Sequence, residues 1–96
     1  MPMVTITGTY KDANAVNLTG EVVFTLESPY RDTSGDIVYF PTRVVAAVTA
    51  GALSQSLFSA GSGLIYKVEE IFGPRHESFR VTIPTSNANI ADLAHL

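Results

Sequence analysis

The sequence has no cysteine, no tryptophan and little charge, and each shortage excludes a class of protein. Without cysteine the chain has no disulfide framework and no thiolate ligands for a metal ion. Nine acidic and six basic residues give a net charge of −3 with no cluster of either sign, so the basic patch that nucleic-acid binding requires is missing. Only 16% of the residues are charged while 46% are apolar, which favours a surface that a partner covers.

Long hydrophobic runs are also missing. The longest uninterrupted apolar run covers residues 44–48, far short of the roughly 20 residues that a membrane-spanning helix needs. The N-terminal residues MPMVTITG lack the cationic start and apolar core of a signal peptide. We therefore expect no membrane insertion and no export through a signal peptide.

Apolar and polar residues alternate with a period of two, which is typical of half-buried β-strands. β-Branched side chains reinforce the pattern, as in the opening V-T-I-T-G-T-Y. The expected strands cover residues 4–10, 21–26, 37–40, 44–49, 53–58, 64–72 and 77–83. Loops rich in Gly, Asn, Asp and Ser separate them, and the short turn at residues 50–52 is expected to close a hairpin. The pattern predicts an all-β domain at residues 1–84, a seven-stranded antiparallel β-sandwich, followed by a short C-terminal tail at residues 85–96.

The densest run of charged side chains lies between two apolar segments near the C-terminus, and we interpret it as a β-hairpin rather than an active site. A four-residue loop at residues 73–76 pairs Val68 with Val81 on the inner face and Glu69 with Arg80 on the outer face. This register places the apolar side chains in the core and the charged side chains on the surface, and a slip of one residue would exchange the two faces. The charges of this segment are thus explained as cross-strand pairs.

The inward-facing positions of all seven strands predict the core. Glu70 falls among them near a strand end, where it either reaches the rim or caps a neighbouring loop through a hydrogen bond. The predicted core residues are Val4, Ile6, Val22, Phe24, Leu26, Val48, Leu53, Leu57, Tyr66, Val68, Phe79, Val81 and Ile83.

The residues for catalysis or metal binding are sparse. The two histidines, His76 in a turn and His95 near the end, lie in no recognised catalytic motif, so we expect no enzyme and no cofactor. The loop at residues 32–36 lacks the run of carboxylates and the closing glutamate of a calcium loop. A turn in which Asp and Ser bond their own backbone explains it better.

Two groups of apolar residues are candidates for a partner interface. Val23, Val45, Ile65 and Ile71 occupy outward-facing positions where polar residues are expected, and together they would form an apolar patch. In the tail, Asn89 is placed to cap a short helix with Ile90, Leu93 and Leu96 along one side. Such a helix needs a surface to lie on, either the flank of this domain or a neighbouring subunit. We expect the sandwich to fold without residues 89–96.

Aromatic side chains suggest a different kind of binding. Tyr30 and Tyr39 lie in or beside the longest loop, where exposed rings could stack on sugar rings. The alternative is that Tyr39 or Phe40 closes one end of the sandwich, as aromatic residues mostly serve cores.

The order of these segments resembles a known family. V-T-I-T-G-T-Y, L-T-G, E-V-V-F-T, L-I-Y-K-V-E-E, F-R-V-T-I-P and A-D-L-A follow one another as in small β-sandwich modules of tailed-phage virion proteins. Such modules are frequent in phages of actinobacteria, often as the first domain of a minor tail or fibre protein. They are similar in general to immunoglobulin-like and transthyretin-like domains. The resemblance covers nearly the whole chain.

The resemblance implies a non-catalytic structural protein of the virion, a decoration or attachment module bound to capsid or tail. Its partners would be other virion proteins, with many copies in the particle and no contact with nucleic acid or membrane. It would be made in the host cytoplasm and end in the virion. Two alternatives remain open: the N-terminal attachment domain of a longer minor tail or fibre protein, and a carbohydrate-binding module for host surface glycans.

Overall fold

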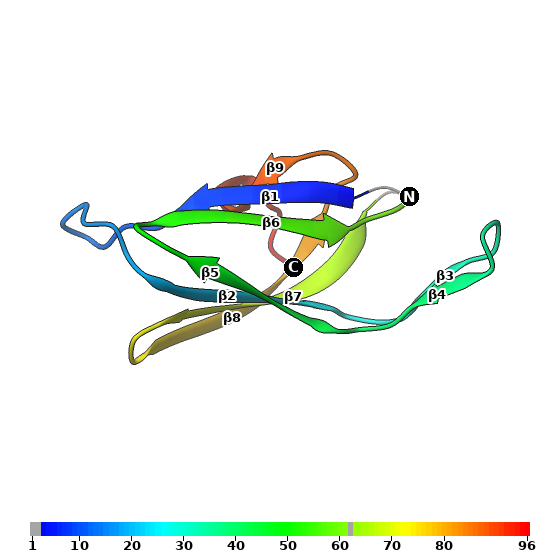
Figure 1. The fold of residues 1–96 in the computed structure, drawn as a ribbon, viewed down its shortest axis with the longest axis horizontal. Coiled ribbons are helices and arrows are strands. Elements are labelled where there is room, and N and C mark those ends of the chain that lie inside the picture. Colours follow the sequence, from blue (N-terminus) through cyan, green and yellow to red (C-terminus); the bar gives the residue numbers. More distant parts are fainter. Residues whose placement is uncertain (1–2, 62) are drawn as a thin grey trace.

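The computed structural model describes residues 3–61 and 63–96, whose strands form two facing sheets and a projecting two-stranded ribbon (Figure 1). One sheet has the order β6-β1-β9, with β6 (Ala52–Phe58), β1 (Met3–Thr9) and β9 (Ala88–Asn89). The other has the order β5-β2-β7-β8, with β5 (Arg43–Val48), β2 (Gly20–Leu26), β7 (Leu64–Phe72) and β8 (Arg75–Ile83). The ribbon pairs β3 (Tyr30–Asp32) with β4 (Ile37–Tyr39). The chain is all-β, as expected, and the arrangement is consistent with a β-sandwich. The described residues contain nine strands, and β3 and β9 were not foreseen.

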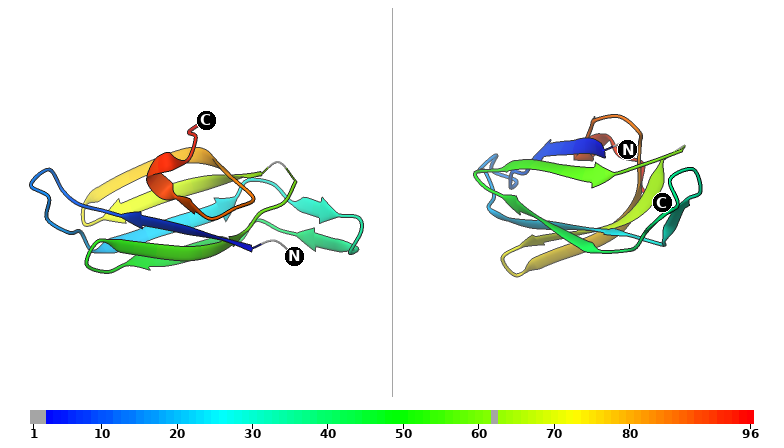
Figure 2. Two further views of the ribbon diagram at one scale, coloured as in Figure 1. Left: turned by 90° about the horizontal axis from the view of Figure 1, so that it is seen from above. Right: turned by 45° about the vertical axis from the view of Figure 1, so that its right-hand side comes forward.

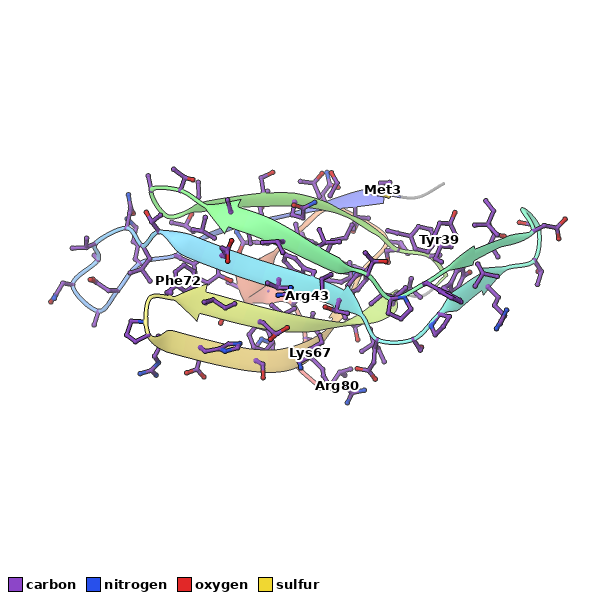
Figure 3. All side chains as sticks on the ribbon, turned by 60° about the horizontal axis from the view of Figure 1, so that its bottom comes forward. Met3, Tyr39, Arg43, Lys67, Phe72 and Arg80 are labelled. Atoms are coloured by element: carbon purple, nitrogen blue, oxygen red, sulfur yellow. The ribbon has the colours of Figure 1, made fainter. Side chains whose placement is uncertain are left out.

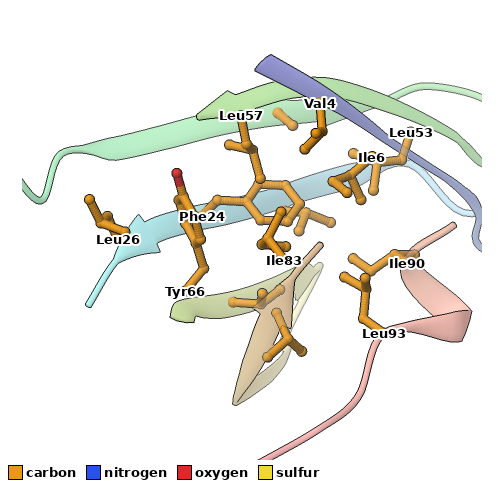
Figure 4. Close-up of a cluster of buried hydrophobic side chains, with 14 of the residues drawn as sticks. Val4, Ile6, Phe24, Leu26, Leu53, Leu57, Tyr66, Ile83, Ile90 and Leu93 are labelled. Atoms are coloured by element: carbon orange, nitrogen blue, oxygen red, sulfur yellow. The ribbon is translucent and has the colours of Figure 1, made fainter. Parts of the chain in front are cut away.

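The core lies between the two sheets, where the inward positions of every long strand meet (Figure 4). Every predicted core residue is buried except Phe79, which is half-buried at the edge of the second sheet. Its ring stacks on the His95 imidazole with centroids 4.3 Å apart. Alternation therefore identified the interior almost completely, because side chains of a strand point to opposite faces in turn.

The connection between β5 and β6 is a corner between sheets, not the predicted hairpin. β5 pairs with β2 and β6 pairs with β1, and only an isolated bridge between Thr49 and Ala52 joins the two strands near the turn. The inward faces of β5 and β6 therefore meet across the core. The turn is held by the N-terminal loop, because the Tyr10 amide donates to the Gly51 carbonyl at 2.8 Å.

The hairpin of β7 and β8 forms, but its predicted register is wrong by two residues. The turn contains only Gly73 and Pro74, so Val68 faces Phe79 and Tyr66 faces Val81. Gly73 has φ of 61°, a left-handed conformation that glycine adopts without strain and that permits the tighter turn. A shift of two residues keeps each side chain on its predicted face. The shift does separate the expected pair: Glu69 now faces Ser78, and Arg80 faces Lys67.

The C-terminal tail is part of the packed structure and not an appendage to it (Figure 2). β9 runs parallel to β1, and the 3-10 helix η1 (Ile90–Asp92) follows, with the Asn89 side chain accepting a hydrogen bond from the Ala91 amide at 2.9 Å. Asn89 is thus the expected cap. Ile90 and Leu93 join the core (Figure 4). The expectation of a sandwich that is complete without the tail is therefore wrong.

Two details explain how the tail closes one side of the molecule. Gly8 faces it from β1, and a Cβ at that position would lie 2.5 Å from Ile90 Cγ2, so only glycine allows this approach. Beyond η1 the tail pairs with the edge of β8: the Leu96 amide donates to the Arg80 carbonyl at 2.9 Å, and the Thr82 amide donates to Ala94 at 3.3 Å. The tail thus covers an edge of both sheets.

Candidate binding surface

The ribbon and the adjoining flank of the sandwich enclose an apolar groove of about 400 Å³. Met3 of β1, Val38 of β4 and Phe40 line it with exposed side chains, and Phe40 is 68% exposed (Figure 3 labels Met3). The floor includes Leu57 and Tyr66 of the core. Phe40 therefore does not close the end of the sandwich, and the interpretation that assigned it this role is wrong. Phe40 stands at the rim of a groove.

The ribbon that forms one wall is ordered by its own turn. The Asp32 carboxylate accepts hydrogen bonds from the Ser34 hydroxyl at 2.8 Å, from the Ser34 amide and from the Gly35 amide. These bonds, led by that of the Ser34 side chain, lower the pKa of Asp32. The loop at residues 32–36 is thus a turn in which the Asp32 side chain bonds the loop backbone, as predicted, whereas the Ser34 hydroxyl bonds the Asp32 carboxylate and not the backbone. Within residues 3–61 and 63–96, no group of three or more His, Cys, Asp or Glu side chains is placed to hold a metal ion.

An aromatic cluster fixes the base of the ribbon to the sandwich. Tyr30 and Tyr39 are opposite each other in the ribbon, and both pack on Phe58 of β6. The Tyr39 ring stacks on Phe58 with centroids 3.9 Å apart, and Tyr30 lies 5.6 Å from it in a tilted geometry. Tyr66 donates a 2.6 Å hydrogen bond to the Phe58 carbonyl, which fixes the same strand end from the core side. The structure therefore brings the two predicted glycan-contact residues together, but as half-buried packing residues.

The four outward-facing apolar residues do not form one exposed patch. Val45 is 49% exposed and Ile65 is exposed, whereas Ile71 is half-buried and Val23 is only 1% exposed. Val23 lies between Val45 and Glu69 on the outer face of the central strand β2, and its neighbours cover it. The prediction that Val23 contributes to an exposed surface is wrong.

A row of basic residues crosses the outer face of the second sheet and separates Ile65 from Val45 (Figure 3). Thr25 of β2 pairs with Arg43 on one side and with Lys67 on the other, and Lys67 faces Arg80. Arg80 turns to Glu27 in a two-pronged ion pair, with Nε to Oε2 at 2.6 Å and Nη2 to Oε1 at 2.7 Å. This hydrogen bonding lowers the pKa of Glu27 and raises that of Arg80. The alternation in the sequence predicted that Arg80 lies on the outer face, but it did not predict Glu27 as its partner.

The tail offers less exposed surface than its sequence suggested. Ile90 and Leu93, two of the three candidate interface residues there, are buried in the core of the same chain. Leu96 remains 60% exposed next to Arg80, and it lines, together with Thr25, a second groove of about 620 Å³. Of the two positions considered for the tail, the flank of its own domain is the one it occupies.

The histidines take part in structural contacts. His76 Nε2 lies 3.3 Å from Glu69 Oε2 on the outer face, and His95 stacks on Phe79. In the part of the chain that the structure describes, no serine, threonine or tyrosine hydroxyl bonds to either ring. The buried Ser59 hydroxyl instead donates to the Ile83 carbonyl at 2.9 Å.

Comparison with known proteins adds no relative: no protein-family model and no curated protein matches the sequence. Among the described residues, no helix has the length and apolar character to traverse a lipid bilayer. The apolar groove is the concave surface that exposes Met3, Val38 and Phe40. Its signal in the sequence was the apolar run before Pro41, which the strand pattern had assigned to a strand of the sandwich.

Proposed function

We propose that this chain is a non-catalytic structural module that holds another protein, a decoration or attachment protein of a tailed-phage virion bound to capsid or tail. The virion assignment rests on the resemblance of its segments to phage β-sandwich modules. The mode of action rests on one observation, the groove whose rim exposes Met3, Val38 and Phe40. The N-terminal attachment domain of a longer tail or fibre protein would use the same groove.

The rim supports protein docking for a physical reason. Large apolar side chains held in water beside a concave surface lose water on binding, and grouped exposure of this kind marks interaction sites. The ribbon is anchored by Tyr30, Tyr39 and Phe58, so Phe40 is presented on a supported element and little ordering is needed on binding. We further infer an immunoglobulin-like or transthyretin-like topology, which the division into sheets of three and four strands supports.

Glycan binding is the weaker proposal. Stacking on a sugar requires an open aromatic face, and Tyr39 turns one face to Phe58 at 3.9 Å. Isothermal titration of the protein with host cell-wall polysaccharide is expected to show no heat of binding. Saturable binding that Tyr30→Ala removes from a folded protein would favour the carbohydrate-binding alternative instead.

The experiment is reconstitution with particles. Purified protein is mixed with phage particles that lack it, and the bound fraction and copy number are measured after sedimentation. We expect Phe40→Ser to abolish binding. Val16→Ser is the matched control, because Val16 is also exposed (58%) but lies in the loop at the opposite end of the molecule (Figure 1). Binding that survives Phe40→Ser unchanged, or that Val16→Ser removes equally, would contradict a role for the groove.

A further inference from the structure

The two sheets end in four edge strands, β6 and β9 in one sheet and β5 and β8 in the other. β9 is only two residues long, and residues 94–96 cover part of the edge of β8. β5 and β6 are the other two edges. Within residues 3–61 and 63–96, no backbone group of β5 bonds to anything on the side away from β2.

The edge of β5 has little of what normally prevents association. An uncovered strand is usually protected by charged side chains, above all lysine, by proline or by a bulge, and of these β5 has only Arg43, at its first residue. Five of the six residues in R-V-V-A-A-V are apolar, its inward positions are Val44, Ala46 and Val48, and Val45 is exposed on the outer face. The edge of β6 differs, since its outward positions include Ser54 and Ser56. The β5 edge is therefore the one suited to pairing with another strand.

We propose that β5 pairs antiparallel with β5 of a second copy of this chain, which joins the two four-stranded sheets into one across a two-fold axis. A two-fold axis normal to the sheet places one residue of the strand opposite its own counterpart, and Val45 is one of the two central residues of β5. Val45 then contacts Val45 of the second copy. This pairing extends the apolar stripe already formed with Val23.

Charge complementarity selects a second copy as the occupant. With Val45 on the axis, Arg43 lies opposite Ala47 of the second copy, and the next residue in that row is Glu21, which pairs with Ala47 in its own sheet. Two strand spacings, about 10 Å, separate the two backbones, and the small Ala47 side chain leaves the space open for an Arg43–Glu21 ion pair. Two such pairs form, one on each side of the axis.

Within one copy this pair cannot form. Thr25 is the partner of Arg43, and Glu21 lies four residues away along β2, or roughly 13 Å. A dependence of association on both residues together would therefore report contact between copies.

Sedimentation velocity of the purified chain over a dilution series tests the pairing without particles, so its result is independent of the particle-binding experiment. We expect a monomer–dimer equilibrium in which Val45→Lys raises the dissociation constant by about tenfold or more, because two lysines meet at the axis. Ser54→Lys, the same change on the β6 edge, should leave it unchanged. Circular dichroism confirms that both variants fold.

Charge reversal gives the sharper result. Arg43→Glu and Glu21→Arg should each weaken the dimer, and the double variant should restore it. A wild-type chain that stays monomeric at every concentration means that the β5 edge meets a different protein or none, and it overturns the proposal. Three other results would also overturn it. They are a dimer that persists in Val45→Lys, a dimer that is lost in Ser54→Lys, and a double charge reversal that does not restore dimerisation.

Discussion

The Tyr10 hydroxyl donates a 2.6 Å hydrogen bond to Glu70 Oε2, joining the residue after β1 to the inner face of β7. This contact explains how a glutamate occupies an inward-facing position of a strand. Of the two positions considered from the sequence, Glu70 takes the one in which it bonds a neighbouring loop. The Tyr10 ring also packs on Phe72, with centroids 4.9 Å apart, so the hydroxyl and carboxylate meet in partly buried surroundings.

Removing this donor should weaken the fold. Tyr10→Phe keeps the ring contact with Phe72 but leaves the Glu70 carboxylate without its partner, at an expected cost of about 1–2 kcal/mol. Urea denaturation measures the change. Tyr30→Phe is the control, since no hydrogen bond of the Tyr30 hydroxyl contributes to the structure described. Equal stability of Tyr10→Phe and the wild type would show that water replaces Tyr10 at the carboxylate.

The same contact predicts a loss of stability in alkali. Burial, followed by the hydrogen bond and the charge of Glu70, raises the pKa of Tyr10 well above its ordinary value near 10. In the unfolded chain the tyrosine ionises at a lower pH than in the folded chain. The stability that the protonated Tyr10 contributes is therefore complete below about pH 10 and is lost as the pH rises further. Burial also raises the pKa of Tyr66, which adds to the effect. The free energy of unfolding, measured against pH, should fall less steeply above pH 10 in Tyr10→Phe.

Two phenylalanines on inward positions should differ in their contribution to stability. Phe24 is fully buried at the centre of the core, so Phe24→Ala should cost about 3–5 kcal/mol. Phe79 is half-buried beside His95, and Phe79→Ala should cost distinctly less. Thermal unfolding of the two variants gives the comparison. A cost for Phe79→Ala as large as that for Phe24→Ala would place Phe79 in the core after all.

The tail should be necessary for folding. Deleting residues 89–96 removes Ile90 and Leu93 from the core and exposes the edge of β8, so we expect a strongly destabilised or unfolded chain. Leu93→Ala alone should cost about 2–5 kcal/mol. Leu96→Ala is the matched control, because this side chain is mostly exposed and should change stability little. A truncated protein with wild-type thermal stability would contradict the tail's place in the core.

How far the sequence predicts this protein can be judged from particular elements. Alternation along residues 4–10 and 21–26 identified Ile6, Val22 and Phe24 as core residues, and the structure buries all three. Asn89 was identified as a cap from its position before a short apolar segment, and it caps η1. These features depend on a few neighbouring residues, so a single chain contains the information. The groove around Phe40 was missed because the ribbon looked like one more strand of the sandwich.

The partners of the strands were decided by tertiary structure. A turn of two residues in place of four moved the β7–β8 register, and both versions satisfy the same alternation. The chain from β5 to β6 reads as a hairpin, yet β5 pairs with β2 in one sheet and β6 pairs with β1 in the other. Which side chains point inward follows from the sequence alone, because the period of two is a local property of an extended chain. The sequence does not specify which edges meet, because this depends on contacts between distant segments and on how much apolar surface each arrangement removes from water.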